Sequence, residues 1–263
     1  MSKVYPLFSG SRRNCYCITS GSSSILIDVG RSARQIEQSL KDNNIDIHTI
    51  KGVFITHEHT DHMKGVRVLA SKYGFPVYAT QGTLTELDKI HQLVPDKFES
   101  HIITDGTEVA GMTVKTFKTS HDCCESVGYT VETSNNRKVT LVTDTGCITP
   151  EIRQSLSGSD VVIIESNHDV NMLLNGRYPY SLKRRILSNY GHISNDTCSQ
   201  LLPELVKEGT SRIVLAHLSK ENNLPQLALQ SARCSLQKEN MKENIDYTLT
   251  VAKEIGDGSY IVF

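Results

Sequence analysis

The chain has 263 residues, which is enough for one large domain or two ordinary ones, and its 28 basic side chains almost balance 29 acidic ones. This balance excludes a global electrostatic field as the basis for binding nucleic acid or a membrane surface, so a polyanion would have to be bound by a local patch. No stretch approaches the roughly 20 apolar residues of a membrane span, and residues 1–8 lack a secretory signal pattern, so we predict a cytoplasmic protein.

The first part of the chain alternates short β-like runs with amphipathic helical patterns. Ser32 is the predicted N-cap of the first helix, and Asn43-Asn44 ends that helix. The predicted elements are strands at residues 4–8, 15–19, 24–28 and 52–56, helices at 33–42, 63–73 and 82–93, and a strand at 76–79.

The middle of the chain is rich in strands, and the alternation of strand and helix then resumes. No internal repeat or low-complexity linker divides the sequence, so we predict one layered domain over residues 1–263, with sheets inside and helices outside. The predicted elements are strands at residues 112–119, 127–133, 139–143, 161–164 and 213–216, helices at 179–189, 196–208 and 224–239, and strands at 247–251 and 260–263.

A dense group of metal-binding residue types, His57-Glu58-His59-Thr60-Asp61-His62, directly follows the apolar strand at 52–56. The pattern H-x-H-x-D-H suits two adjacent ions, because His57 and His59 point the same way from an extended segment while Asp61 and His62, after a bend, can face a second centre. Zincin proteases need H-E-x-x-H, and Asp61 stands where the second histidine would fall. The alternative is a polar surface turn that holds several histidines.

Three further residues of the same types follow predicted strands: His121, Asp144 and His217. Each alone is most simply an ordinary loop residue, since loops often carry His and Asp. Because all three occur in a chain that also contains the six-residue motif, we interpret them as further metal ligands. Two ions can be surrounded only by residues from several converging loops.

Seven cysteines without a C-x-x-C pair predict free thiols rather than disulfides. Cys123-Cys124 lies close to His121, but vicinal cysteines seldom ligate one ion together. We therefore interpret this pair as part of an exposed loop or a core contact.

These motifs, together with Asp28, resemble the metallo-β-lactamase fold superfamily over essentially the whole chain. The resemblance implies a four-layer αββα sandwich and a role for Asp28 in holding the histidine-rich loop. The metal ligands that it implies are His57, His59 and His121 on one ion, Asp61, His62 and His217 on the other, and Asp144 bridging both.

A closer resemblance is to the bacterial YycJ/WalJ family, described as cytosolic exonucleases that act on double-stranded DNA. The early Ser-Gly-Ser-Ser-Gly-Asn loop of that family reads Ser9-Gly10-Ser11-Arg12-Arg13-Asn14 here, which puts substrate size or backbone contacts in doubt. The matching segments are Thr119-Ser120-His121-Asp122 with Gly128-Tyr129, Thr143-Asp144-Thr145-Gly146, Glu165-Ser166-Asn167-His168-Asp169, Gly191-His192-Ile193-Ser194-Asn195 and Leu215-Ala216-His217-Leu218-Ser219.

His192 precedes Ser194, which together with Asn195 can cap the helix predicted from residue 196. A phosphate could there meet an imidazole and free backbone N–H groups together, so we interpret His192 as an acid or phosphate binder; the alternative is a histidine in a polar turn. His168 and Asp169 also follow a strand and are assigned to supporting the metals, against the alternative of a satisfied loop pair.

Two basic runs, Arg12-Arg13 and Lys183-Arg184-Arg185, could contact a phosphate backbone and so bind DNA, although such runs are more often solvated faces. The residues assigned to substrate phosphate are Arg12, Arg13, Asn14, Ser194 and Asn195. The sequence does not predict an oligomeric state.

The expected reaction is hydrolysis of a phosphodiester by a 5′–3′ exonuclease. Two ions about 3.5 to 4 Å apart activate a bridging hydroxide as nucleophile and clamp the attacking and leaving oxygens. The ligand types suit zinc or manganese, and Asp61 and His192 are the residues assigned to catalysis.

Several rivals share this fold, because fold does not determine function. A cyclic phosphodiesterase would use the same seven ligands and the same His192, and thioesterase and β-lactamase activities are not separated by ligands alone. Flavin-dependent di-iron reductases typically place Glu where His59 stands, and residues 144–217 are too few for the large domain of some RNA-degrading members. A non-catalytic partner of a signalling or repair complex has no physical need for all seven ligands.

Overall fold

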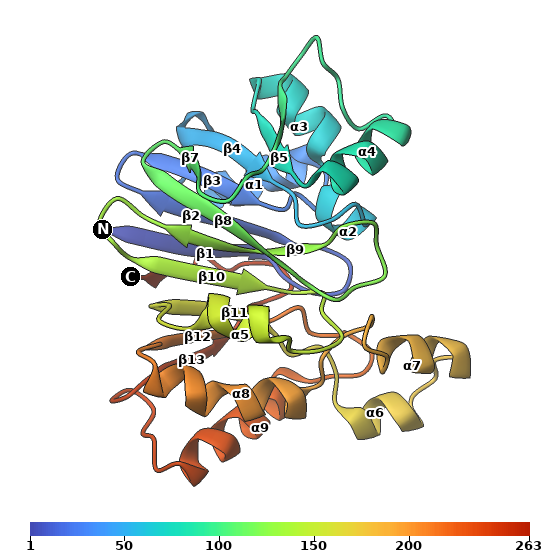
Figure 1. The fold of residues 1–263 in the computed structure, drawn as a ribbon, viewed down its shortest axis with the longest axis vertical. Helices are drawn as coiled ribbons and strands as arrows, with labels where there is room; N and C mark the ends of the chain where they lie inside the picture. The colour runs from blue at the N-terminus through green and yellow to red at the C-terminus, as the bar shows by residue number, and fades with distance from the viewer. The chain divides into compact units, whose positions relative to one another are not determined.

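The computed structural model describes residues 1–263, which form two units that are treated in turn. Unit 1 comprises Met1–Thr116, Cys123–Arg137 and Lys253–Phe263, and unit 2 comprises Phe117–Asp122 and Lys138–Ala252. Both units combine strands with helices (Figure 1). The single domain over residues 1–263 stays a prediction.

Unit 1 contains a seven-stranded sheet that supports the histidine-rich loop. Its elements are β1 (Ser2–Phe8), β2 (Cys15–Ser20), β3 (Ser23–Ile27), α1 (Ala33–Asp42), η1 (Ile47–Thr49), β4 (Ile50–Phe54), α2 (Thr60–Met63), α3 (Val66–Tyr73), β5 (Val77–Ala79), α4 (Gln81–Lys89), β6 (Ser100–Ile102), β7 (Thr107–Val109), most of β8 (Met112–Lys118), β9 (Val127–Glu132) and β14 (Ile261–Val262). The strand order is β14-β1-β2-β3-β4-β5-β6, and β3 to β6 run parallel. Buried Leu26, Val53 and Val77 form a core with Ile36 and Leu69 from the helices.

The helix predicted at residues 63–73 is divided in the structure into α2 and α3. The break lies at Gly65, whose N–H donates to the Val29 carbonyl at 2.8 Å. A Cβ atom at position 65 would lie 2.5 Å from the Arg31 carbonyl oxygen, so only glycine allows the two backbone segments to approach this closely. Helical periodicity alone does not reveal this contact.

Gly30 is also required by a close approach of backbone, and we expect Gly30→Ala to lower the free energy of unfolding by about 3 kcal/mol or more. A Cβ there would lie 1.6 Å from the Asp61 carbonyl oxygen and 2.8 Å from the Asn14 nitrogen. Urea denaturation measures the loss. The control is Gly21→Ala, where φ is +59° but no atom lies within 4 Å of the added Cβ, so only about 1 kcal/mol should be lost. Equal losses would show that the close approach does not require glycine.

Unit 2 is built on parallel strands. Its elements are β10 (Lys138–Val142), α5 (Pro150–Leu156), β11 (Val161–Glu165), α6 (Val170–Asn175), α7 (Tyr180–Ile186), α8 (Asn195–Lys207), β12 (Arg212–Ala216), α9 (Pro225–Lys238) and β13 (Thr248–Val251). The strands lie in the order β13-β12-β11-β10. Helices α8 and α9 lie side by side along the unit, and α6 and α7 lie together at one end of it (Figure 1). Buried Val162, Leu202 and Leu236 share one core.

The register of unit 2 places the ends of its strands at one sheet edge. Val142 pairs with Ile164, and Ile164 pairs with Leu215. Because parallel strands present their carboxyl ends at the same edge, the residues that follow converge there. Asp144 and His217 come directly from this edge.

No helix of the structure is long and apolar enough to cross a bilayer. All seven cysteines are free thiols, which confirms that prediction, and Cys124 is exposed as expected of a loop residue. The cytoplasmic location stays a prediction.

Candidate metal centre

Residues 57–62, here called the His loop, follow β4 in unit 1 and bring three imidazoles together. The His57 ring centroid lies 4.1 Å from that of His62 and 4.6 Å from that of His59. His57 and His62 are buried, and His59 is the N-cap of α2. The bend predicted within the motif is therefore the start of this short helix.

Asp28 holds the His loop from β3, as the family resemblance implied. Its Oδ2 accepts a hydrogen bond from His62 Nδ1 at 2.7 Å, and its Oδ1 accepts from the Thr56 backbone N–H at 2.9 Å. With the proton on Nδ1, the lone pair of His62 lies on Nε2. A histidine that donates one N–H to a carboxylate is typical of metal sites, because this fixes the tautomer and the ring orientation. Burial raises the pKa of Asp28, and the hydrogen bonds from His62 and Thr56 oppose that rise.

Asn14 contacts two of the predicted metal ligands and is not exposed on the surface. It is fully buried, and its amide Nδ2 lies 3.0 Å from His62 Nε2 and 3.3 Å from Asp61 Oδ2. Arg13 forms an ion pair with Glu254 at 2.9 Å, while Arg12 is exposed. The roles of Arg12, Arg13 and Asn14 toward a substrate phosphate stay predictions.

Unit 2 has its own group of titratable side chains, here called the Glu165 cluster: Asp144, Glu165, His192 and His217. One ligand atom from each lies within 4.8 Å of the others. Glu165 Oε1 accepts hydrogen bonds from His192 Nδ1 at 2.7 Å and from His217 Nδ1 at 2.9 Å. One carboxylate oxygen therefore orients two imidazoles and places the lone pair of each on Nε2.

His121 lies beside this cluster, three residues after the end of β8. Its Nδ1 lies 3.2 Å from the Gly191 carbonyl oxygen, and its ring centroid is 5.1 Å from that of His192. Burial lowers the pKa of His121, while the nearby Asp144 carboxylate acts against that fall. His121, His192 and His217 thus share a tautomer in which Nδ1 is held by a protein oxygen.

Glu165 is a functional residue that the sequence alone does not predict, because the family motif at residues 165–169 contains it without indicating a role. Burial raises the pKa of its carboxyl, but the His192 and His217 imidazoles more than reverse this and hold the pKa below its ordinary value. The ionised form also accepts from the Thr145 N–H at 3.2 Å and the Ile193 N–H at 3.3 Å. One feature of the sequence could have indicated this role: Glu165 is an acidic residue directly after the apolar run Val161-Val162-Ile163-Ile164.

His168 and Asp169 do not contact the Glu165 cluster by hydrogen bonds. Neither ring nitrogen of the buried His168 has a hydrogen-bond partner, and burial lowers the pKa of His168 to about 4, so the ring is neutral. Asp169 caps α6 by accepting from the Met172 N–H at 2.8 Å. A structural role is thus observed for Asp169, and support of the metals stays a prediction for both residues.

Ser194 caps α8, as predicted, and accepts from the Thr197 N–H at 3.2 Å. Asn195 is buried and its amide oxygen accepts from the Ser166 hydroxyl at 2.6 Å. Its amide nitrogen donates to Asn223 at 2.9 Å. Asn195 therefore builds a buried polar network, and the phosphate-binding roles of Ser194 and Asn195 stay predictions.

The basic run on α7 is partly used within the protein. Arg185 donates to Asp122 at 2.7 Å, and Lys183 donates to the Leu174 carbonyl at 2.7 Å. Arg184 lies 6.0 Å from the centroid of the Tyr180 ring. These contacts agree with the solvated helix face that was the alternative to a DNA-binding patch.

Three residues of the candidate centre have left-handed backbone conformations. The φ angles are +59° for Asp28, +55° for Asp144 and +54° for His217. Such conformations cost about 1–3 kcal/mol each in a non-glycine residue and concentrate at functional sites. Each residue stands just after a strand, where the turned backbone redirects its side chain.

The residues present fit divalent metal ions by the chemistry of their donor atoms. The imidazoles of His62, His121 and His217 are oriented through Nδ1 and carry lone pairs on Nε2. Buried carboxylates accompany them, and neutral imidazole together with carboxylate is a ligand set that suits zinc and manganese.

Comparison with known proteins finds similarity over most of the chain. Residues 23–218 match the model of the beta-lactamase superfamily domain. The chain is 38% identical over 226 residues to a protein of Bacillus anthracis named exodeoxyribonuclease YycJ, covering 86% of this chain and 85% of that one. It is 33% identical over 244 residues to exodeoxyribonuclease WalJ of Streptococcus pneumoniae, covering 92% and 90%.

Among solved structures, the metallo-β-lactamase fold protein YhfI of Bacillus subtilis matches with a TM-score of 0.75 and 15% identity, covering 100% of both chains. This likeness shows the fold and not the activity. It confirms the predicted α/β sandwich of the metallo-β-lactamase type, with mixed sheets flanked by helices. The fold and the donor set together imply divalent metal ions.

Proposed function

Because the chain belongs to the beta-lactamase superfamily and, within it, to the family of the exodeoxyribonucleases YycJ and WalJ, we propose that it is a metal-dependent phosphodiesterase that degrades double-stranded DNA from 5′ ends. The observation that supports this best is the double hydrogen bond of Glu165, which orients His192 and His217 on a single carboxylate oxygen. A carboxylate that holds imidazoles by Nδ1 is the usual support of histidines at a metal site.

The proposed ligands of two divalent ions, zinc or manganese, are His57, His59, Asp61, His62, His121, Asp144 and His217. When bound, such ions supply a nucleophile at neutral pH and stabilise the charge that develops on the phosphate oxygens. Asp28 and Glu165 keep the imidazoles in the tautomer that this binding requires.

We assign His192 to binding the phosphate or to moving a proton to the leaving oxygen. Its side chain is 13% exposed, whereas those of His121 and His217 are 1% exposed, so a substrate can reach it more easily than the other two. Glu165 holds Nδ1 of His192, which leaves Nε2 as the atom that can exchange a proton. Asp61, with a side chain that is 25% exposed, is assigned a catalytic role in addition to metal binding.

The proposed partner is DNA, bound through local cations because the net charge is only −1. Arg12 is exposed and lies two residues before Asn14, which contacts the His loop. The proposed approach of the DNA backbone is therefore along the early loop at residues 9–14.

The function is tested by incubating purified protein with duplex DNA labelled at either end, with manganese, zinc or a chelator. We expect nucleotides to be released from 5′ ends with one of the two metals and no release with chelator. Cyclic nucleotides form the parallel substrate set. If the protein hydrolyses cyclic nucleotides but leaves duplexes intact, it is a cyclic phosphodiesterase and not a nuclease. If it hydrolyses neither substrate, the proposed function is wrong.

A further inference from the structure

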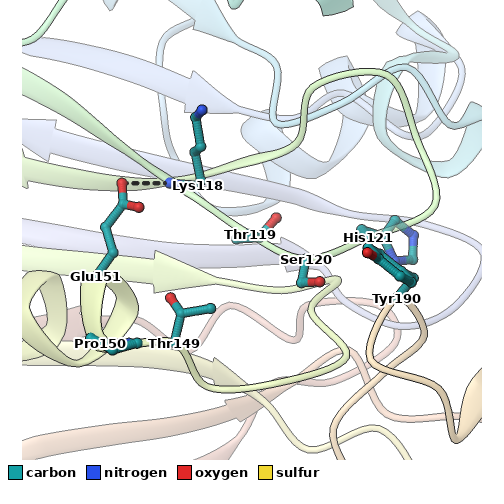
Figure 2. Close-up of a pocket in the computed structure, with 8 residues that line it drawn as sticks. All are labelled: Lys118, Thr119, Ser120, His121, Thr149, Pro150, Glu151 and Tyr190. Carbon is teal, nitrogen blue, oxygen red and sulfur yellow. Dashed lines mark hydrogen bonds between the residues drawn. The ribbon is translucent and has the colours of Figure 1, made fainter.

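A cavity of about 410 Å³ opens beside His121 within unit 2 (Figure 2). This volume lies within the range of about 300–1,000 Å³ that is usual for small-molecule sites. The cavity is lined by Lys118, Thr119, Ser120, His121, Thr149, Pro150, Glu151 and Tyr190. Since His121 is a proposed metal ligand, a group that fills this cavity would lie next to the phosphate under attack.

Tyr190 is the aromatic wall of the cavity, and it is 63% exposed. It belongs to the turn between α7 and α8, in which the Gly191 N–H donates to the Ser188 carbonyl at 2.9 Å and the His192 N–H donates to the Ile186 carbonyl at 3.0 Å. The backbone at Tyr190 is therefore held by a hydrogen-bonded turn rather than by a loose loop.

The same turn is joined to His121 and His192. The Gly191 carbonyl lies 3.2 Å from His121 Nδ1, and His192 directly follows Gly191. A Cβ at Gly191 would lie 2.2 Å from the Ile186 carbonyl oxygen, so this tight turn requires glycine. The backbone that carries Tyr190 is thus held next to the segment that contacts His121 and carries His192.

The charged residues that line the cavity are one cation, Lys118, and one anion, Glu151, so the lining carries no excess of positive charge that would select a second phosphate. Glu151 lines it, and its Oε1 accepts from the Lys118 backbone N–H at 3.0 Å, which holds a carboxylate at one side (Figure 2). Figure 2 shows His121 and Tyr190 together at the other side. The carboxylate opposes a phosphate on its own side of the cavity, whereas an uncharged base can stack on the phenol ring at the other side.

We propose that this cavity receives the nucleoside next to the scissile phosphate and that Tyr190 stacks on its base. The inference rests on the proposed nuclease function and names the part of the substrate that the cavity binds. Stacking tolerates any base, since every base has a π face, and this suits an enzyme that degrades DNA of any sequence.

The test uses a duplex with fluorescent 2-aminopurine at the terminal position and a non-hydrolysable terminal linkage, so that stacking is read as quenching without turnover. The metal-loaded protein should quench the fluorescence, Tyr190→Phe should keep the quenching, and Tyr190→Ala should lose it. On cleavable duplexes, Tyr190→Ala should raise KM on the order of ten-fold or more, with kcat nearly unchanged. A duplex with a terminal abasic site should remove the difference between the wild-type protein and Tyr190→Ala.

The matched control is Tyr180→Ala, which removes a tyrosine that is 76% exposed on α7 in the same unit but does not line the cavity. This variant should leave quenching and KM unchanged. If duplexes are cleaved but Tyr190→Ala quenches and binds like the wild type, the inference is wrong and the nuclease function stands. If the wild-type protein neither binds nor cleaves duplexes, the function and the inference fail together. Retained quenching by Tyr190→Phe would show that the base contacts the ring and not the hydroxyl.

Discussion

Replacing Asp144 with Asn should lower the rate of phosphodiester hydrolysis by more than about 100-fold. Loss of a residue that only supports a metal ligand typically costs up to about 100-fold, and the loss of a ligand itself should cost more. Asp144 Oδ1 lies 3.5 Å from His217 Nδ1, 3.6 Å from His121 Nε2 and 3.7 Å from His192 Nδ1. It thus sits among three imidazoles as the carboxylate proposed to bridge the ions. Asparagine removes the charge but tolerates the φ of +55° at this position, so the backbone should be retained.

Initial rates on labelled duplex and metal content per protein molecule measure this effect. Asp88→Asn is the matched control, because it removes an exposed carboxylate on α4. The control should retain full activity and metal content. An Asp144→Asn protein with normal rates and normal metal content would exclude Asp144 as a metal ligand. A cellular role that survives the loss of metal would instead favour a non-catalytic binding protein.

Glu165→Gln should lower the hydrolysis rate by about 10–100-fold and also lower thermal stability, although glutamine has the same shape. The carboxylate accepts hydrogen bonds on both oxygens, from two imidazoles on Oε1 and from the backbone N–H groups of Thr145 and Ile193 on Oε2. A glutamine must direct its NH₂ group at one of these two sets of donors. The resulting buried donor without an acceptor costs about 1–3 kcal/mol.

Circular dichroism melting, metal content and initial rates measure this prediction together. The control is Glu239→Gln, which removes a surface carboxylate paired with Lys207 at 2.8 Å, a kind of pair worth about 0–1 kcal/mol. That variant should change none of the three measurements. Wild-type rates and metal content for Glu165→Gln would mean that Glu165 does not orient His192 and His217 for the reaction.

The fold was predictable where elements are long and apolar, and less so where they are short. The strand predicted at 161–164 is β11 (Val161–Glu165), and the helix predicted at 224–239 is α9 (Pro225–Lys238). Residues Val170–Asn175 and Ser100–Ile102 form elements that were not predicted, because six and three residues are too few to show a period. Helix α5 was also missed, although Thr149 followed by Pro150 is a start signal for a helix.

The candidate centre was predictable where its residues are neighbours in the chain. His57, His59 and His62 cluster because six consecutive residues form one bend, and the family motif contains that bend. Glu165 was not predicted, because its role arises only from contact with His192 and His217, which lie 27 and 52 residues away in the chain.

The sequence by itself determined the residue types that can bind metal, the strands that they follow and the family to which the chain belongs. Those properties are local, since they depend on residue identity and on spacing within short segments. Only the tertiary structure decided that Glu165 orients two histidines, that Asn14 lies buried against His62, and that Tyr190 stands beside His121 on one cavity. The physical reason is that parallel strands bring distant residues to one sheet edge, where hydrogen bonds between buried groups select their partners by distance and not by separation along the chain.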